Sequence, residues 1–215
     1  MGLTPDVSFR ALRIANINRL PLFKNKNGEI AHSQPDASDW SLDDWLVALN
    51  GEVGELFNLI KKVSRRDYTL AALRQELSDE IADVVIYLDI LSFRVGAPTV
   101  NPSLSRFSEV DTTMLWHNCT SRSKTCTTLV KLLGDLALII QHTNRGTKLT
   151  EEQAEALTSI CACTFDVLVR LAEFLNVDLS WAVIDKFNAV SHRVGADVTL
   201  SLEGNIALVD GAQRA

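Results

Sequence analysis

The chain has 215 residues, of which 47% are hydrophobic and 22% are charged, and its formal net charge is −6 at pH 7. This composition is typical of a soluble globular protein that can bury a sizeable core, and it excludes a largely disordered chain. The negative balance supplies no basic stripe for a nucleic-acid backbone, so no nucleic-acid polymer is expected as a partner.

Apolar residues recur at helical spacing through most of the chain, which predicts an all-α fold. In chain order, the predicted helices cover residues 7–20, 41–66, 69–95, 121–144, 150–175 and 178–195. Capping boxes are predicted to begin two of them, at Ser41 and Thr150, and Gly96 is predicted to end the third in a left-handed conformation. Polar stretches predict a loop over 23–37 and a linker over 98–120. Two alternating apolar segments predict a small hairpin over 198–202 and 206–209.

The four cysteines are too few for a disulfide scaffold, and their spacing does not match a structural zinc site. No apolar run approaches the length of a membrane span, and the first residues lack the apolar core of a signal peptide. These features predict a cytoplasmic protein with no membrane partner.

The second half of the sequence resembles the first. Setting Gly54-Glu55-Leu56 beside Gly134-Asp135-Leu136 brings the apolar positions of two helical pairs into register. Two acids are lost in the second copy, where Leu132 replaces Glu52 and Cys163 replaces Glu80. The alternative is that there was no duplication, because the apolar positions of any two helical hairpins can be aligned moderately well.

This duplication predicts a single all-α domain over 1–215. Its parts are a catalytic helical repeat, 41–96, and a degenerate second repeat with a closing helix, 121–195.

Two pairs of acids lie on neighbouring predicted helices. They are Glu52 with Glu55 and Glu80 with Asp83, and residues three apart are neighbours on a helix surface. Four like charges on facing helices repel unless a cation lies among them. Carboxylate oxygens suit a hard divalent ion such as Mg²⁺, which keeps open positions for substrate phosphates. An ordinary charged helix face is the alternative.

The run Glu52-Val-Gly-Glu55 followed by Glu80-Ile-Ala-Asp83 resembles the ExxE…ExxD signature of MazG-like nucleotide pyrophosphohydrolases. That superfamily includes all-α dUTPases and dCTP pyrophosphatases. The segment 58–62 fits the same pattern, and 178–188 is similar to the closing helix of the family. The resemblance covers about 40–96 and 176–195, and it implies a MazG-like helical bundle.

The resemblance also implies an activity, namely hydrolysis of a (d)NTP to the (d)NMP and pyrophosphate. The implied metal ligands are Glu52, Glu55, Glu80 and Asp83, with Mg²⁺ as the cofactor and Mn²⁺ as its expected substitute. Glu52 or Glu55 is expected to orient the attacking water. The candidates for contact with phosphate, sugar or base are Lys61, Tyr87, Trp45, Lys186, Asn188 and Arg193. Core packing is the alternative for each aromatic residue.

Other functions remain open at this point. The same scaffold could serve one base only, as a dUTPase or a dCTPase. A non-catalytic helical module that binds metal or nucleotide is the alternative from another class. Family members commonly pair into dimers or tetramers, so a homo-oligomer is an expectation too, although the fused second half could take the place of a partner subunit.

Overall fold

The computed structural model describes residues 9–29, 31, 39–97, 118–141, 149–201 and 206–208. Its helices are α1 (Phe9–Arg19), α2 (Leu42–Ser64), α3 (Arg74–Arg94), α5 (Arg122–Gln141), α6 (Glu151–Leu175) and α7 (Leu179–Val194). A 3-10 turn, η1 (Leu20–Leu22), follows α1, and two short strands close the described chain, β1 (Val198–Leu200) and β2 (Ile206–Leu208). The prediction of a mainly helical protein is confirmed. Most of the predicted linker and part of the predicted loop lie outside the described residues.

Local sequence signals set most of the helix ends. The side chains of Ser41 and Thr150 each accept a hydrogen bond from the third helical residue, and both capping boxes are complete. Gly96 and Gly195 have φ angles of +74° and +70°, the left-handed conformation expected after a helix end. The predicted start of α3 at about residue 69 was wrong, because Thr69 caps a separate turn and the helix begins only at Arg74.

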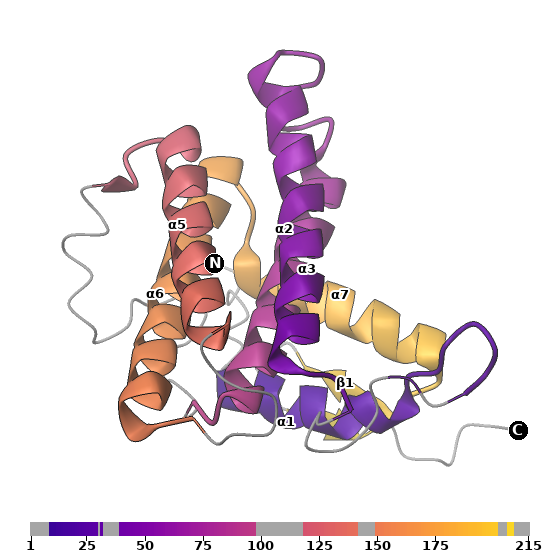
Figure 1. Cartoon of the computed structure of the whole chain (residues 1–215). Helices are drawn as coiled ribbons and strands as arrows, with labels where there is room; N and C mark the ends of the chain where they lie inside the picture. The colour runs from indigo at the N-terminus through magenta and orange to yellow at the C-terminus, as the bar shows by residue number, and fades with distance from the viewer. Residues whose placement is uncertain are drawn as a thin grey trace, which may run out of the picture.

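The helices form two hairpins that pack side by side (Figure 1). One hairpin is α2 with α3, and the other is α5 with α6. Helix α2 contacts α5, and α3 contacts α6. Large side chains of the first hairpin fill the centre and are fully buried, among them Trp45, Leu49, Leu56, Leu77 and Leu88. The turn between α2 and α3 projects from the body of the protein (Figure 1).

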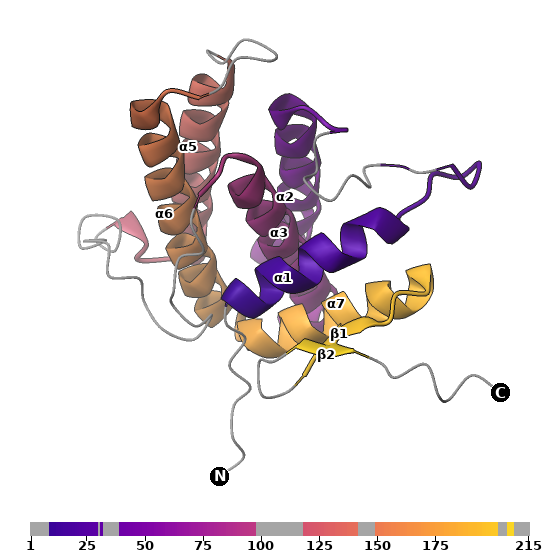
Figure 2. The ribbon, with the colours of Figure 1, turned by 90° about the horizontal axis from the view of Figure 1, so that it is seen from below.

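Helices α1 and α7 cross the first hairpin near its other end. Figure 2 shows α1 beside α3, with α7 and the two strands next to it. The strands are antiparallel and pair Val198 with Leu208, so the predicted hairpin is confirmed over the paired residues. No helix in the described ranges has both the length and the apolar character required to cross a membrane.

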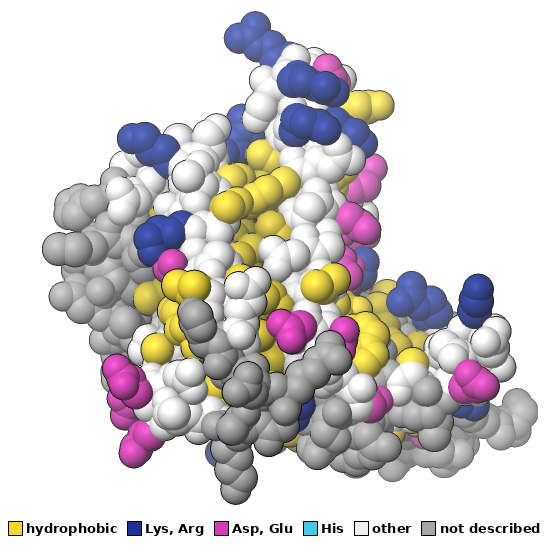
Figure 3. Space-filling view, viewed as in Figure 1, with side chains coloured by type: hydrophobic (Ala, Val, Ile, Leu, Met, Phe, Trp, Pro, Cys, Tyr) yellow, Lys and Arg dark blue, Asp and Glu magenta, His cyan; other side chains and the backbone are white. Residues whose placement is uncertain are grey.

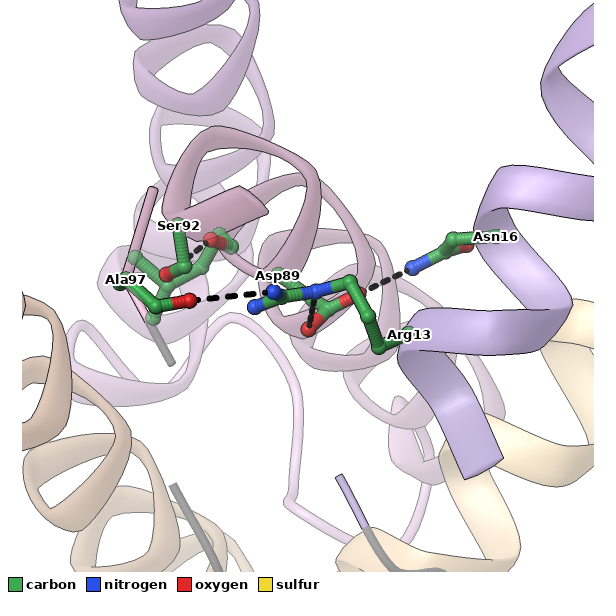
Figure 4. A network of polar contacts seen from close by, with 6 residues as sticks. Arg13, Asn16, Asp89, Ser92 and Ala97 are labelled. Atoms are coloured by element: carbon green, nitrogen blue, oxygen red, sulfur yellow. Dashed lines mark hydrogen bonds and ion pairs between the residues drawn. The ribbon is translucent and has the colours of Figure 1, made fainter. Parts of the chain in front are cut away.

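A buried polar network fixes α1 on α3 (Figure 4). Arg13 Nε donates to Asp89 Oδ1 at 2.9 Å, and Asn16 Nδ2 donates to Asp89 Oδ2 at 2.9 Å. Arg13 Nη1 also donates to the carbonyl of Ala97 at 3.3 Å. Because both oxygens of Asp89 are used and the residue is only 1% exposed, α1 is held in one register along α3. That register decides which α1 side chains face the α2–α3 hairpin and α7.

Candidate functional site

The α2–α3 hairpin brings three acids together. Glu52 of α2 and both Glu80 and Asp83 of α3 each offer one carboxylate oxygen, and these atoms all lie within 4.8 Å of one another. All three residues are partly buried. Glu55, one helical turn beyond Glu52, is exposed and lies outside this group of three. Acidic side chains can be followed along the edge of this hairpin above α7 (Figure 3). We call Glu52, Glu80 and Asp83 the acid cluster.

The acid cluster is short of positive charge. Burial raises the pKa of Glu52 to about 7, and the charges of Asp83, Glu55 and Glu80 add to that effect. Burial also raises the pKa of Glu80, with the next largest effect coming from Glu55. Glu55 is therefore close enough to act on both carboxylates electrostatically. A cation among these oxygens would remove the repulsion and favour their ionised forms.

One ammonium group from the closing helix reaches the acid cluster. Lys186 Nζ of α7 lies 2.6 Å from Asp83 Oδ2, and both side chains are largely buried. Burial alone would lower the pKa of Lys186, but the hydrogen bond to Asp83 and the surrounding acidic charges outweigh it and raise the pKa overall. Lys186 thus reaches the first hairpin although about 100 residues of sequence separate it from Asp83.

A cavity of about 160 Å³ opens beside the acid cluster. Glu52, Asp83 and Lys186 line one part of it. The lining also includes Trp45, seven positions before Glu52 on α2, and Ile90, seven positions after Asp83 on α3. Each lies about 10 Å along its helix from the acid cluster. Most of the remaining lining is apolar or aromatic, namely Leu20, Phe23, Trp45, Ile86, Tyr87, Ile90 and Val190. Two polar residues of α1, Asn16 and Arg19, and Arg193 of α7 complete it. The cavity therefore joins a charged end to an apolar end.

Three of the predicted substrate-binding residues line this cavity in addition to Lys186. Tyr87 is partly buried, and its ring lies 6.3 Å from that of Trp45 between centroids. Trp45 is fully buried, so it forms part of the core as well as part of the cavity wall. Arg193 is exposed at the edge.

Two other predicted residues lie elsewhere. The Asn188 side chain donates to the carbonyl of Leu200 at 2.9 Å and accepts from the amide of Leu200 at 2.8 Å, so it attaches β1 to α7. Lys61 is exposed and follows Glu52 by nine residues, which turns it about 180° away around α2. Lys62 follows Glu55 by seven residues, which is about two turns, so it lies on the same face of α2 as Glu55.

Sequence reasoning missed the contribution of α1. Asn16 and Arg19 are almost fully buried and line the cavity. A signal was present, because Arg13, Asn16 and Arg19 recur every three residues between the apolar positions Leu12 and Leu20. A polar stripe at that spacing on a core-facing helix predicts buried polar groups that need partners.

Comparison of the chain with protein-family models, with curated proteins and with solved structures found no match.

Proposed function

We propose that this protein hydrolyses a nucleoside or deoxynucleoside triphosphate to the monophosphate and pyrophosphate, with Mg²⁺ held by Glu52, Glu80 and Asp83. The observation that carries the proposal is the acid cluster itself, whose oxygens lie within 4.8 Å of one another at the charged end of the cavity. A divalent ion between carboxylates and phosphates is the usual way in which proteins handle nucleotide phosphates.

The residues of the cluster fit a hard divalent ion. All three ligands offer oxygen, which suits Mg²⁺ and Mn²⁺ better than softer metals. Without a cation, Glu52 has a pKa of about 7 because it is half buried among like charges. When bound, Mg²⁺ would supply the positive charge that neutralises phosphate oxygens and activates water.

The chain's own groups can be assigned roles around that ion. Glu55 is exposed beside the cluster, so it has room to accept a proton from the attacking water, and Glu52 is the other candidate. Lys186 holds Asp83 in place and can turn its remaining donors to a phosphate oxygen. Arg193, at the edge of the cavity, can stabilise the departing pyrophosphate.

We also propose that the two hairpins arose by duplication. A groove between α2 and α5, where Figure 3 shows apolar side chains, is lined by four pairs of positions that are each 80 residues apart. These pairs are Asn50 with Val130, Val53 with Leu133, Gly54 with Gly134 and Phe57 with Ala137. If the two hairpins are copies related by a pseudo-twofold axis, equivalent positions of α2 and α5 would face each other across the groove, as these pairs do. In this arrangement the second hairpin supports the first, as a partner subunit would.

The test is pyrophosphate release from a panel of dNTPs and NTPs, with Mg²⁺ or with EDTA, with each product resolved by chromatography. We expect monophosphate and pyrophosphate only with the metal, and the fastest substrate will separate a dUTPase or dCTPase from a broader enzyme. Glu55→Gln should abolish turnover. The matched control is Asp135→Asn, which changes the aligned acid of the second hairpin, where Asp135 pairs with Lys131.

The outcomes separate the competing functions. Turnover by Glu55→Gln at the wild-type rate would refute the proposed site. Absence of turnover for every nucleotide, together with stabilisation by Mg²⁺ or nucleotide, would indicate a non-catalytic binding module.

A further inference from the structure

Arg19 has an incomplete set of hydrogen bonds inside the cavity. The residue is 3% exposed. Its Nη1 donates to the carbonyl of Phe187 at 2.8 Å, and its Nη2 lies 3.5 Å from Asn16 Oδ1. Its Nε has no acceptor in the part of the chain that the structure describes. A buried donor without an acceptor is costly, especially on a charged group, so an acceptor brought by a ligand would be favourable there.

The Arg19 guanidinium is held firmly in this position. Its central carbon lies 3.7 Å from the centroid of the Phe187 ring, which supports one face of the group. Asn16 donates its amide N–H to Asp89, an acceptor-only carboxylate, so the amide oxygen is the atom left to face Arg19. The buried network of Figure 4 therefore extends through Asn16 to Arg19. A donor held in this way is prepared for a ligand before the ligand arrives.

The surroundings of Arg19 indicate which part of a nucleotide it meets. Its hydrogen bonds and ring contacts involve Asn16, Phe23 and Phe187 and none of the acid cluster, within the described residues. The charge of Asp83 also acts on Arg19, but the ion pair of Asp83 is with Lys186. Arg19 lines the cavity together with aromatic and aliphatic side chains. Such walls suit a flat nucleobase, whose edge carries acceptor atoms.

We propose that Arg19 is a specificity-determining residue whose guanidinium donates to an acceptor on the edge of the nucleobase, either an oxo group or a ring nitrogen. This inference rests on the proposed function in one respect, which is that the ligand of the cavity is a nucleotide. It adds a contact to the base that the acid motifs alone do not predict. A base that presents an amino group at that position would leave two donors facing each other and would be rejected.

The experiment separates contact with the base from contact with the phosphates. The probes are α,β-imido analogues of the four common deoxynucleoside triphosphates and of 2-deoxyribose 5-triphosphate without a base, each with Mg²⁺. Binding is measured by calorimetry for the wild type and for Arg19→Met, which removes every donor but keeps an unbranched apolar stem. We expect the tightest-binding nucleotide to lose about 10- to 100-fold in affinity, since a hydrogen bond from a charged group has about this effect. The probe without a base should change by less than about twofold.

Two further variants show whether the effect of Arg19→Met is specific to the base contact. Arg19→Lys keeps the charge and the stem but lacks the planar guanidinium, so it should also weaken the nucleotide selectively, and it carries the test if Arg19→Met fails to fold. Arg13→Met is the matched control, because it removes another buried arginine of α1 whose donors go to Asp89 and Ala97. It should lower stability without changing the ratio between the two classes of probe.

The results that overturn the inference are distinct from those that overturn the proposed function. Equal weakening of both classes of probe by Arg19→Met would assign Arg19 to the phosphates. Unchanged binding of both would leave it a purely structural residue. In either case nucleotide binding and hydrolysis by the wild type would stand. If the wild type binds no nucleotide at all, both proposals fail together.

Discussion

Glu52→Gln tests the acid cluster most directly, because it removes one charge and leaves the shape of the side chain almost unchanged. The pKa of Glu52 is about 7 in the folded protein, against an ordinary value of 4.5. The folded state thus binds the proton more tightly than the unfolded state does. In the absence of metal, the ionisation of Glu52 must lower the free energy of unfolding as the pH rises from about 4.5 to about 7.

The size of this loss of stability follows from the difference between the folded and unfolded pKa values of Glu52. A difference of about 2.5 pKa units corresponds to at most about 3 kcal/mol, and solvent screening of a half-exposed side chain reduces it to about 1–2 kcal/mol. Glutamine does not ionise, so Glu52→Gln should stabilise the metal-free protein by about that amount at pH 8. The gain should fall to less than half at pH 5.5, because by then Glu52 is largely protonated in the folded state.

With Mg²⁺ bound, the wild type should become more stable than Glu52→Gln. The wild type gains stability from an ion that binds only the folded state, by about 2.7 kcal/mol at 100 times the dissociation constant. Glu52→Gln has lost one ligand and should gain much less. The variant should therefore be the more stable protein in EDTA and the less stable one in Mg²⁺.

The assay is thermal unfolding of both proteins at pH 5.5 and pH 8, in EDTA and in a Mg²⁺ series, with each kcal/mol moving Tm by about 2–4 °C in a chain of this size. Asp135→Asn is the control, and its unfolding should show no dependence on Mg²⁺ beyond that of the wild type. The reasoning is refuted if Glu52→Gln is less stable than the wild type in EDTA at pH 8. It is refuted as well if both proteins gain equally from Mg²⁺.

Three further predictions concern Lys186 at the acid cluster and two residues, Asn188 and Asp89, that hold neighbouring elements in place. Lys186→Met should tighten Mg²⁺ binding, because the ion no longer competes with the ammonium for Asp83. This should appear as a larger metal-dependent shift in Tm. Turnover should fall at least about 100-fold. Turnover within a few-fold of wild type would remove Lys186 from the site. Asn188→Ala should cost about 1–3 kcal/mol in urea unfolding, since it leaves both polar groups of Leu200 without their partner, yet it should not change KM. A raised KM with unchanged stability would instead restore Asn188 as a substrate contact. Asp89→Asn should cost about 3–5 kcal/mol by leaving the buried charge of Arg13 without a counter-charge. A loss below about 1 kcal/mol by the same urea assay would show that the network does not hold α1.

Features governed by neighbours along the chain could be predicted from the sequence. The capping boxes at Ser41 and Thr150 and the left-handed glycine at Gly96 depend on a few consecutive residues. The spacing of three residues likewise placed Glu80 and Asp83 on one face of α3. The alternation of apolar residues after α7 was enough to locate the strand pair.

The packing of distant segments decided the rest of the candidate site. Lys186 meets Asp83 because α7 crosses α3, whereas Asn188, only two residues later, points to Leu200 on β1. A spacing of two residues on a helix turns a side chain by about 200°, so both could not face the same cavity. Both residues were expected at the site because the resemblance to the closing helix implied both, and the sequence alone does not say which of them α7 turns towards α3.

By itself, then, the sequence determined the helical elements, their ends and the carboxylate pairs, since these follow from interactions within a turn or two of helix. Only the tertiary structure brought Arg19 into the cavity and Glu52 into the group with Glu80 and Asp83. Those positions depend on contacts between residues that are far apart along the chain, such as the hydrogen bonds from Arg13 and Asn16 to Asp89, and on the burial that such contacts create. Burial also sets the pKa of Glu52, which therefore comes from the fold and not from the local sequence.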